Sequence, residues 1–313
     1  MTHISQYCDS YGILLRREAL DRGLRDETLI RLVRLKVLTR IRQGAYVLTD
    51  IWHKASPAER HNLLARSVLR LYSDDVVLSH ASSCIWQGGP DWGIQSDAVD
   101  LTDVKGRNGR KQARVVHHRG VCPEDDVVTH DGLRTTKPAR AVVEVLSVDG
   151  LEPALVQANH FLHAGQMSLE ELHRFTRTAL TWPGSLAAES LWRLATPLIE
   201  SVGETRTYLA MWRHGVPLPD CQVDIADANG VFIGRVDFAW CKERVIVEFD
   251  GLSKYAIVRP GEDPAAALVR EKLREDALRA NGWTVIRLTW ADLNRPEAMA
   301  ARIRNALSRS AVA

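Results

Sequence analysis

Three carboxylates lie within two apolar stretches in the last third of the chain. Asp237 interrupts the first stretch, and Glu248 and Asp250 interrupt the second, which follows after the polar residues 241–244. Side chains alternate between the two faces of a strand, so Glu248 and Asp250 are expected to share a face. Residues 241–244 are short enough to close a hairpin that brings Asp237 near them. Carboxylates that converge on a sheet favour Mg²⁺ or Mn²⁺, with Asp237, Glu248 and Asp250 as the ligands.

A divalent cation at this place would support phosphodiester hydrolysis. A bound cation neutralises phosphate charge, lowers the pKa of a water molecule and holds the leaving oxygen. Two other interpretations of the acids involve no metal: a solvated sheet edge, or salt bridges to Arg235 and Arg270.

The first 52 residues have the pattern of a winged helix-turn-helix. The expected elements are helices at residues 4–11, 15–22 and 26–36 and strands at 37–41 and 44–48. The third helix and the strand after it carry the cations that would contact phosphates, which are Arg31, Arg34, Lys36, Arg40 and Arg42. The alternative is a solvated helix face that happens to be basic.

Residues 53–183 are expected to form a mixed α/β domain. Ser56, Pro57 and Glu59 predict a helix start, because they combine an N-cap, a proline in the first turn and a capping-box acid. A basic, glycine-containing loop between two expected strands would grip a phosphate backbone. Its cations are Lys105, Arg107, Arg110 and Lys111. The alternative is an exposed hairpin loop whose charge keeps the protein soluble.

Residues 184–313 are expected to form a third domain, in the order helix, three strands, helix, strand, helix. Asn229-Gly230 is a strong signal for a tight hairpin between the first two strands. The chain is therefore predicted to be a multidomain protein of the α/β (α+β) class. Its last domain should contain a mixed sheet flanked by helices.

Composition limits the classes of function. The 313 residues include 41 Lys and Arg against 39 Asp and Glu, so nucleic-acid affinity must come from local basic patches. The five cysteines show no CxxC spacing, which favours a reducing cytoplasm over a disulfide framework or a zinc site. No stretch approaches the roughly 18 apolar residues of a membrane span, so a cytoplasmic location without a membrane partner is expected.

Short motifs in the first two regions resemble the AbiEi-type antitoxins. These motifs are residues 42–46, 79–83 and 133–140. The resemblance implies that the winged helix binds operator DNA and represses a toxin–antitoxin operon, while the following domain contributes to binding or assembly. It also implies a cognate toxin encoded nearby, and a repressor of this kind is expected to bind a palindromic site as a homodimer.

Motifs in the last domain resemble relatives of the very-short-patch-repair endonucleases, a group within the PD-(D/E)xK nuclease superfamily. These motifs are residues 204–206, 234–240, 248–251 and 282–287. The resemblance implies a restriction-endonuclease-like fold that acts on DNA with Mg²⁺ or Mn²⁺.

The resemblance also assigns roles to individual residues. Glu204 is similar to the family's helical acid, Asp237 to its metal-binding aspartate and Glu248 to the second acid. Asp250 stands where the superfamily commonly has a lysine. Lys254 and Lys272 are the two candidates for a lysine at another position that would stabilise the developing charge. For Lys272 the alternative is an ordinary ion pair with the acids three and four residues further along its helix.

Two functions are consistent with these patterns. The first is a DNA-binding protein with a Mg²⁺-dependent nuclease-like domain, related to toxin–antitoxin or phage-defence systems. The second is a non-enzymatic antitoxin and transcriptional autorepressor whose nuclease-like fold is inactive. A third interpretation, an interaction module with Trp182, Trp192 and Trp212 as contact residues, competes with the burial of these tryptophans in cores. Metal-dependent cleavage separates the first function from the other two.

Overall fold

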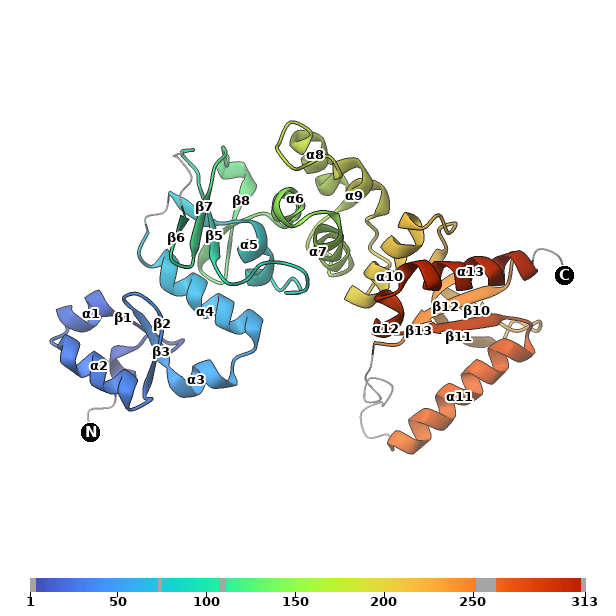
Figure 1. Cartoon of the computed structure of the whole chain (residues 1–313), viewed down its shortest axis with the longest axis horizontal. Coiled ribbons are helices and arrows are strands. Elements are labelled where there is room, and N and C mark those ends of the chain that lie inside the picture. Colours follow the sequence, from blue (N-terminus) through green and yellow to red (C-terminus); the bar gives the residue numbers. More distant parts are fainter. Residues whose placement is uncertain (1–3, 73–74, 107–110, 252–262, 311–313) are drawn as a thin grey trace. The chain divides into compact units, whose positions relative to one another are not determined.

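The computed structural model describes residues 4–72, 75–106, 111–251 and 263–310 (Figure 1). The chain divides into two compact units, one of Met1–Phe161 with Gln166–Arg193 and one of Leu162–Gly165 with Leu194–Ala313. Helices and three separate sheets in the described residues confirm the predicted α/β (α+β) multidomain class. Within the same residues, no helix is both long and apolar enough to cross a membrane.

The first unit begins with the elements of the predicted winged helix-turn-helix. They are η1 (Ile4–Tyr7), β1 (Ile13–Leu15), α1 (Arg16–Asp21), α2 (Asp26–Arg34), β2 (Leu38–Arg42) and β3 (Ala45–Leu48). The strands form an antiparallel sheet in the order β1-β3-β2.

The first predicted helix, residues 4–11, is wrong beyond its first turn. The side chain of Asp9 accepts hydrogen bonds from the backbone N–H groups of Tyr11 and Ile13, at 3.0 and 2.8 Å. Gly12 then adopts a φ of +76°, which suits glycine and ends any helical path. The chain therefore turns and enters β1, whose three residues are fully buried against β3.

The winged-helix sheet and the region that follows share one hydrophobic core. Ile13, Leu15 and Val47 pack in the same buried cluster as Leu64 and Val68 of α4 (Pro57–Leu69). The predicted capping box of Ser56 and Glu59 starts that helix. Because the core is shared, the N-terminal elements are held on α4 and do not form a separate globule.

A six-stranded sheet makes up the rest of the first unit. The strands are β4 (Val76–Leu78), β5 (Val99–Asp103), β6 (Lys111–Gln112), β7 (Val115–His118), β8 (Val127–His130) and β9 (Leu133–Thr136), in the order β6-β7-β5-β4-β9-β8. The other elements are α3 (Thr49–Lys54), α5 (His80–Trp86), η2 (Glu124–Asp126), α6 (Pro138–Asp149), α7 (Leu151–His163), α8 (Leu169–Ala179) and α9 (Ala188–Leu194). Since β4 and β9 are parallel neighbours, the helices that follow them, α5 and α6, begin side by side.

The second unit contains a four-stranded mixed sheet between helices (Figure 1). Its elements are α10 (Val202–Arg213), β10 (Asp220–Ala226), β11 (Phe232–Trp240), β12 (Val245–Phe249), α11 (Pro264–Ala280), β13 (Thr284–Leu288), α12 (Trp290–Leu293) and α13 (Pro296–Ser310). The strand order is β10-β11-β12-β13, and only the last pair is parallel.

Alternation along the strands of this sheet builds a core on each face. Phe238 and Val247 pack in a buried cluster with Met211 of α10 and Ile303 of α13. Ala239 and Ile246, on the opposite face, pack in a second cluster with Leu278 of α11. The face covered by α11 is therefore the one on which Asp237 and Glu248 are expected.

We predict that Gly203→Ala destabilises the second unit. A Cβ at Gly203 would lie 1.9 Å from Cε1 of Phe249, whose ring packs edge-on against Trp290 at 5.1 Å between centroids. Moving a packed ring should cost about 1–3 kcal/mol of unfolding free energy, measured by urea denaturation. Gly251→Ala is the matched control, because its Cβ would meet the same ring at an ordinary 3.7 Å. Equal stability of the two variants would contradict this packing.

Candidate functional site

Asp237 and Glu248 lie next to each other where the ladder between β11 and β12 ends. The last pair of that ladder toward this end is Phe238 with Val247, which makes the two acids the next residues in register. Oδ2 of Asp237 accepts a hydrogen bond of 2.8 Å from the backbone N–H of Phe249. The hairpin predicted from residues 241–244 is therefore present, and it places the acids as expected.

Glu204 reaches the same place from the first turn of α10. Ser201 caps this helix by accepting a hydrogen bond from the backbone N–H of Glu204 at 3.1 Å. The buried Glu204 carboxylate accepts hydrogen bonds of 3.1 Å from the N–H of Glu200 and from Nε2 of Gln222. Its negative charge therefore faces Asp237 from a fixed position.

Burial and the charge of Glu204 together raise the pKa of Asp237 to about 7. The hydrogen bond from Phe249 acts in the opposite direction but does not offset them. Among the described residues, no lysine or arginine forms an ion pair with Asp237 or Glu204. Arg274 is near enough to act against the raised pKa of Asp237 but forms no ion pair with it, so a divalent cation would add positive charge to this acid pair.

Glu248 has a different environment, because two arginines neutralise it. Nη2 of Arg274 lies 2.7 Å from Oε1 of Glu248, and Nη2 of Arg287 lies 3.6 Å from Oε2. Both arginines also pair with Glu271, and Nε of Arg287 lies 2.9 Å from Glu275. These five side chains, which we call the arginine network, attach α11 and β13 to the end of β12.

The other predicted residues of this site lie apart. Asp250 is exposed, and its backbone N–H donates to the carbonyl of Leu288 at 2.7 Å. Lys272 is exposed on α11, whereas Lys254 lies outside the described residues. The part of the chain that is described contains no group of three or more His, Cys, Asp or Glu side chains that could hold a metal.

The predicted ligands Asp237, Glu248 and Asp250 are accordingly not gathered into one cluster. Two carboxylates with waters and substrate phosphate oxygens are an ordinary set for Mg²⁺. Glu204 and Asp237 fit that set, while Glu248 is occupied by arginines.

The sequence argument missed Arg274, Arg287 and Gln222. One signal was present for Arg274, because Glu271, Arg274 and Glu275 alternate in charge at helical spacing. Nothing in the sequence indicated that this helix face would lie over Glu248.

The cations predicted to bind DNA also differ in environment. Arg31, Arg34, Lys36 and Arg40 are exposed. Arg42 is half-buried, its Nε and Nη1 atoms have no hydrogen-bond partner, and burial lowers its pKa. Four exposed cations, two on α2, one on β2 and Lys36 in the turn between them, thus remain available to phosphates.

The predicted basic loop is described only in part. Lys105 pairs with Asp75 at 2.8 Å between Nζ and Oδ2. Arg107 and Arg110 lie outside the described residues, and of Lys111 only the backbone is described, in β6.

Two motifs far apart in the sequence, residues 79–83 and 133–140, come together at the starts of α5 and α6. The buried hydroxyl of Ser83 accepts from Oγ1 of Thr135 at 2.7 Å and from Oγ1 of Thr136 at 3.1 Å. Glu144 accepts from the backbone N–H of His80 at 3.0 Å and from Thr136 at 3.1 Å. The motifs therefore form one buried polar network.

Comparison with known proteins gives relatives but no activity. No family model matches the sequence. Two proteins of Mycobacterium tuberculosis, the uncharacterized proteins MT2308 and Rv2248, are each 28% identical over 271 residues, which is 85% of this chain and 94% of theirs. The crystal structure of the RV2827C protein from the same species has a TM-score of 0.40 and 15% identity, covering 61% of this chain and 73% of that chain.

We predict that Asp237→Asn removes a pH-dependent loss of stability. With a pKa near 7, the folded protein binds a proton at Asp237 that the unfolded chain releases near pH 4. Stability therefore falls as the pH rises from about 4 to about 7, where wild type loses up to about 4 kcal/mol at this group. Relative to wild type, the free energy of unfolding of the asparagine variant should increase most at about pH 8 and should not increase below about pH 4.

Urea denaturation across this pH range measures the effect. Asp250→Asn, at an exposed carboxylate close by on the chain, is the matched control and should follow the wild-type curve. Parallel curves for wild type and Asp237→Asn would show that Asp237 is not an uncompensated buried acid.

Proposed function

We propose that this protein binds DNA and that its second unit is a metal-dependent, nuclease-like domain. The observation that carries the proposal is the pair of Glu204 and Asp237, two acids at the end of a mixed sheet with no arginine or lysine in ion-pair contact among the described residues. A buried acid with a raised pKa, as at Asp237, is typical of functional sites. The resemblance of this domain to very-short-patch-repair relatives supports the same activity.

Glu204 and Asp237 would hold a Mg²⁺ or Mn²⁺ ion. Such a cation supplies charge neutralisation on the scissile phosphate and a water of lowered pKa. The arginine network holds Glu248 beside the pair and keeps α11 against the sheet. Lys254 is the remaining candidate for stabilising the developing charge, because Lys272 sits on the exposed side of α11 among solvent-facing residues.

In this proposal the first unit binds duplex DNA. Helix α2 presents Arg31 and Arg34 on its outer face, and the neighbouring β2 presents Arg40. This arrangement suits a helix in the major groove with the adjacent strand against the phosphate backbone. The resemblance to AbiEi-type antitoxins supports an operator site, a homodimer, a cognate toxin as partner and a cytoplasmic role in a toxin–antitoxin or phage-defence system.

One observation favours a second function, an autorepressor with an inactive nuclease-like fold. Glu248, which the resemblance assigns as the second acid of the site, is already neutralised by Arg274 and Arg287. A carboxylate paired in this way is a poor metal ligand, because the cation must displace two guanidinium groups. Both functions share the DNA-binding unit.

Cleavage of supercoiled plasmid and single-stranded DNA with Mg²⁺, Mn²⁺ or EDTA tests the nuclease proposal. Wild type should cut only with metal. Asp237→Asn and Glu204→Gln should each lower the cleavage rate at least about 100-fold, since even the loss of a residue that only supports a metal ligand lowers activity 10- to 100-fold. Asp224→Asn, at an exposed acid of β10, is the control and should cut like wild type.

Absence of cleavage by wild type, together with no Mn²⁺-induced rise in its melting temperature, would favour the autorepressor. RNA cleavage measured in the same way decides between the two nucleic acids as substrate.

DNA binding should depend on the outer face of α2. The double variant Arg31→Ala/Arg34→Ala removes two phosphate contacts, so the slope of log affinity against log salt should decrease in magnitude by about 2. Arg177→Ala, at an exposed arginine of α8, should leave the slope unchanged. The slopes are measured by fluorescence anisotropy at several salt concentrations, with a labelled DNA duplex from the region upstream of this protein's own gene. An unaltered slope in the double variant would place the DNA contact elsewhere.

A further inference from the structure

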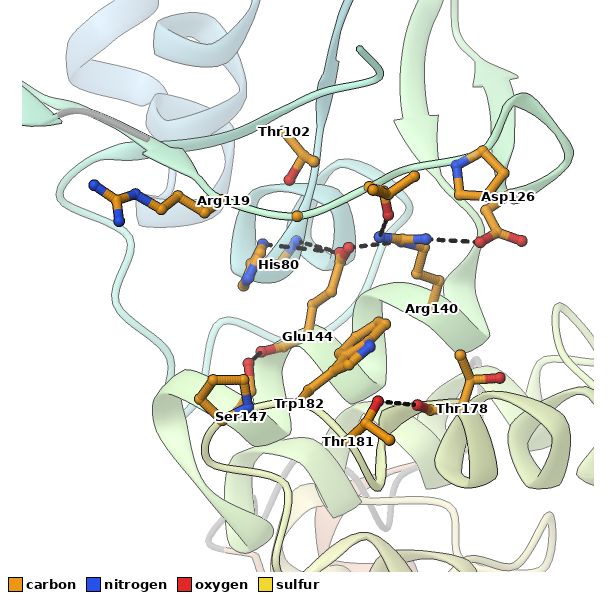
Figure 2. Close-up of a pocket in the computed structure, with 14 residues that line it drawn as sticks. His80, Thr102, Arg119, Asp126, Arg140, Glu144, Ser147, Thr178, Thr181 and Trp182 are labelled. Atoms are coloured by element: carbon orange, nitrogen blue, oxygen red, sulfur yellow. Dashed lines mark hydrogen bonds and ion pairs between the residues drawn. The ribbon is translucent and has the colours of Figure 1, made fainter. Parts of the chain in front are cut away.

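The first unit contains a pocket of about 500 Å³ beside the buried polar network of α5 and α6 (Figure 2). The residues that line it are His80, Thr102, Arg119, Gly120, Val121, Pro123, Asp126, Arg140, Glu144, Ser147, Thr178, Thr181, Trp182 and Pro183. A volume of this size is in the range of small-molecule sites. Neither proposed activity uses this pocket.

The polar wall of the pocket is held rigidly. Arg140 lies between Glu144 and Asp126, with Nε–Oε1 and Nη1–Oδ2 distances of 2.8 and 2.7 Å, and its Nη2 donates to the carbonyl of Val121 at 2.9 Å. Glu144 also accepts the backbone N–H of His80. Because two acids neutralise Arg140, it can orient a polar ligand but has no net positive charge to offer an anion.

The imidazole of His80 is held by hydrogen-bonded hydroxyls in the wall of the pocket. Oγ1 of Thr102 donates to Oγ of Ser79 at 2.8 Å, and that hydroxyl lies 3.0 Å from Nδ1 of His80. Nδ1 also lies 3.8 Å from Oε2 of Glu144, so this ring nitrogen is directed toward the polar network. Burial lowers the pKa of His80 to about 3 and keeps the ring neutral.

The backbone of His80 is also strained, which is typical of functional positions. Its φ is +51°, in the left-handed region, and its ring stacks on His118 at 3.5 Å between centroids. Such a conformation costs about 1–3 kcal/mol for a residue other than glycine. The surrounding hydrogen bonds hold it in place, so the imidazole is fixed before any ligand arrives.

The remaining walls supply an aromatic surface, acceptors and one cation. The ring of Trp182 is half-buried with the guanidinium of Arg140 5.4 Å from its centroid. The hydroxyls of Ser147, Thr178 and Thr181 each donate to a carbonyl of the α6 or α8 region, which leaves their lone pairs as acceptors. Figure 2 shows the exposed Arg119 across the pocket from Trp182.

We propose that this pocket binds a nucleoside monophosphate, with the base against Trp182 and the phosphate on Arg119. A nucleobase is flat and carries both donors and acceptors along its edge, which matches the polar imidazole of His80 and the hydroxyl acceptors. Only one lining cation, Arg119, is not balanced by the lining acids. The pocket therefore suits one phosphate, because Asp126 and Glu144 would repel a longer chain of phosphates.

The test is ligand binding by the full-length protein with adenosine, guanosine, cytidine and uridine 5′-monophosphates as probes. Differential scanning fluorimetry and quenching of tryptophan fluorescence should show saturable binding of at least one of them. Inorganic phosphate and the matching nucleoside should each bind at least about tenfold more weakly than the nucleotide.

Variants of Arg119 and Trp182, the residues proposed to contact the phosphate and the base, test whether the nucleotide binds in this pocket. Arg119→Ala should weaken binding of the nucleotide about tenfold and leave binding of the nucleoside unchanged, since it removes only the phosphate contact. Trp182→Ala should weaken binding of both the nucleotide and the nucleoside about tenfold. Trp182→Phe keeps a stacking ring and should retain both affinities. Arg193→Ala, at an exposed arginine of α9 paired with Glu189, is the control for general loss of positive charge.

Three outcomes would overturn the proposal. The first is no binding of any of the four monophosphates at millimolar concentration. The second is binding that neither Arg119→Ala nor Trp182→Ala alters. The third is stabilisation by a short single-stranded oligonucleotide but by no monophosphate, which would assign the surface to a nucleic-acid strand. Because Arg119 is exposed, its variant tests the site even if Trp182→Ala does not fold.

Discussion

A carboxylate removed from water must gain positive charge, hydrogen-bond donors or a proton, and this constraint organises both units. Glu144 meets it with Arg140 and with the N–H of His80, and thereby fixes the starts of α5 and α6. Glu248 meets it with Arg274 and Arg287, and thereby fixes α11 and β13. Both partners of Glu248 come from other elements, whereas Glu144 pairs with Arg140 on its own helix and accepts from His80 of α5. In each case at least one compensating group belongs to another element, so neutralising the acid also contributes to how the elements pack.

Local patterns predicted the elements but not the charge compensation between them. The capping box at Ser56 and the hairpin at Asn229-Gly230 depend on residues within a few positions of one another, and both are present. The partners of Glu248 are 26 and 39 residues away in the sequence, so no spacing rule brings them together. The first predicted helix failed for a local reason, because the Asp9 side chain and the left-handed Gly12 turn the chain before a second helical turn forms.

The shared core of the first unit explains why a small winged-helix region is stable here. The three short strands have a buried cluster on each face, one formed with α1 and α2 and one shared with α4. Ile13, Leu15 and Val47 complete their burial against α4, and Arg114 ties the region further by donating to the carbonyl of Ile41 at 2.8 Å. The outer face of α2 is then free to carry Arg31 and Arg34, because the inner face alone supplies the packing.

The contrast between the two acid sites of the second unit bears on whether a cation belongs there. Glu248 shows that this fold can neutralise a buried acid with arginines from α11 and β13. Beside it, Glu204 accepts from Gln222 and Asp237 accepts from the N–H of Phe249, and neither acid forms an ion pair among the described residues. Burial and the charge of Glu204 raise the pKa of Asp237 to about 7. A fold that served only as a scaffold would gain stability from replacing either acid with a neutral side chain. A divalent cation reverses that balance, because it converts the repulsion between the two carboxylates into a shared attraction. Under the proposed function, metal binding would account for the acid pair, which is a net cost in stability without a cation.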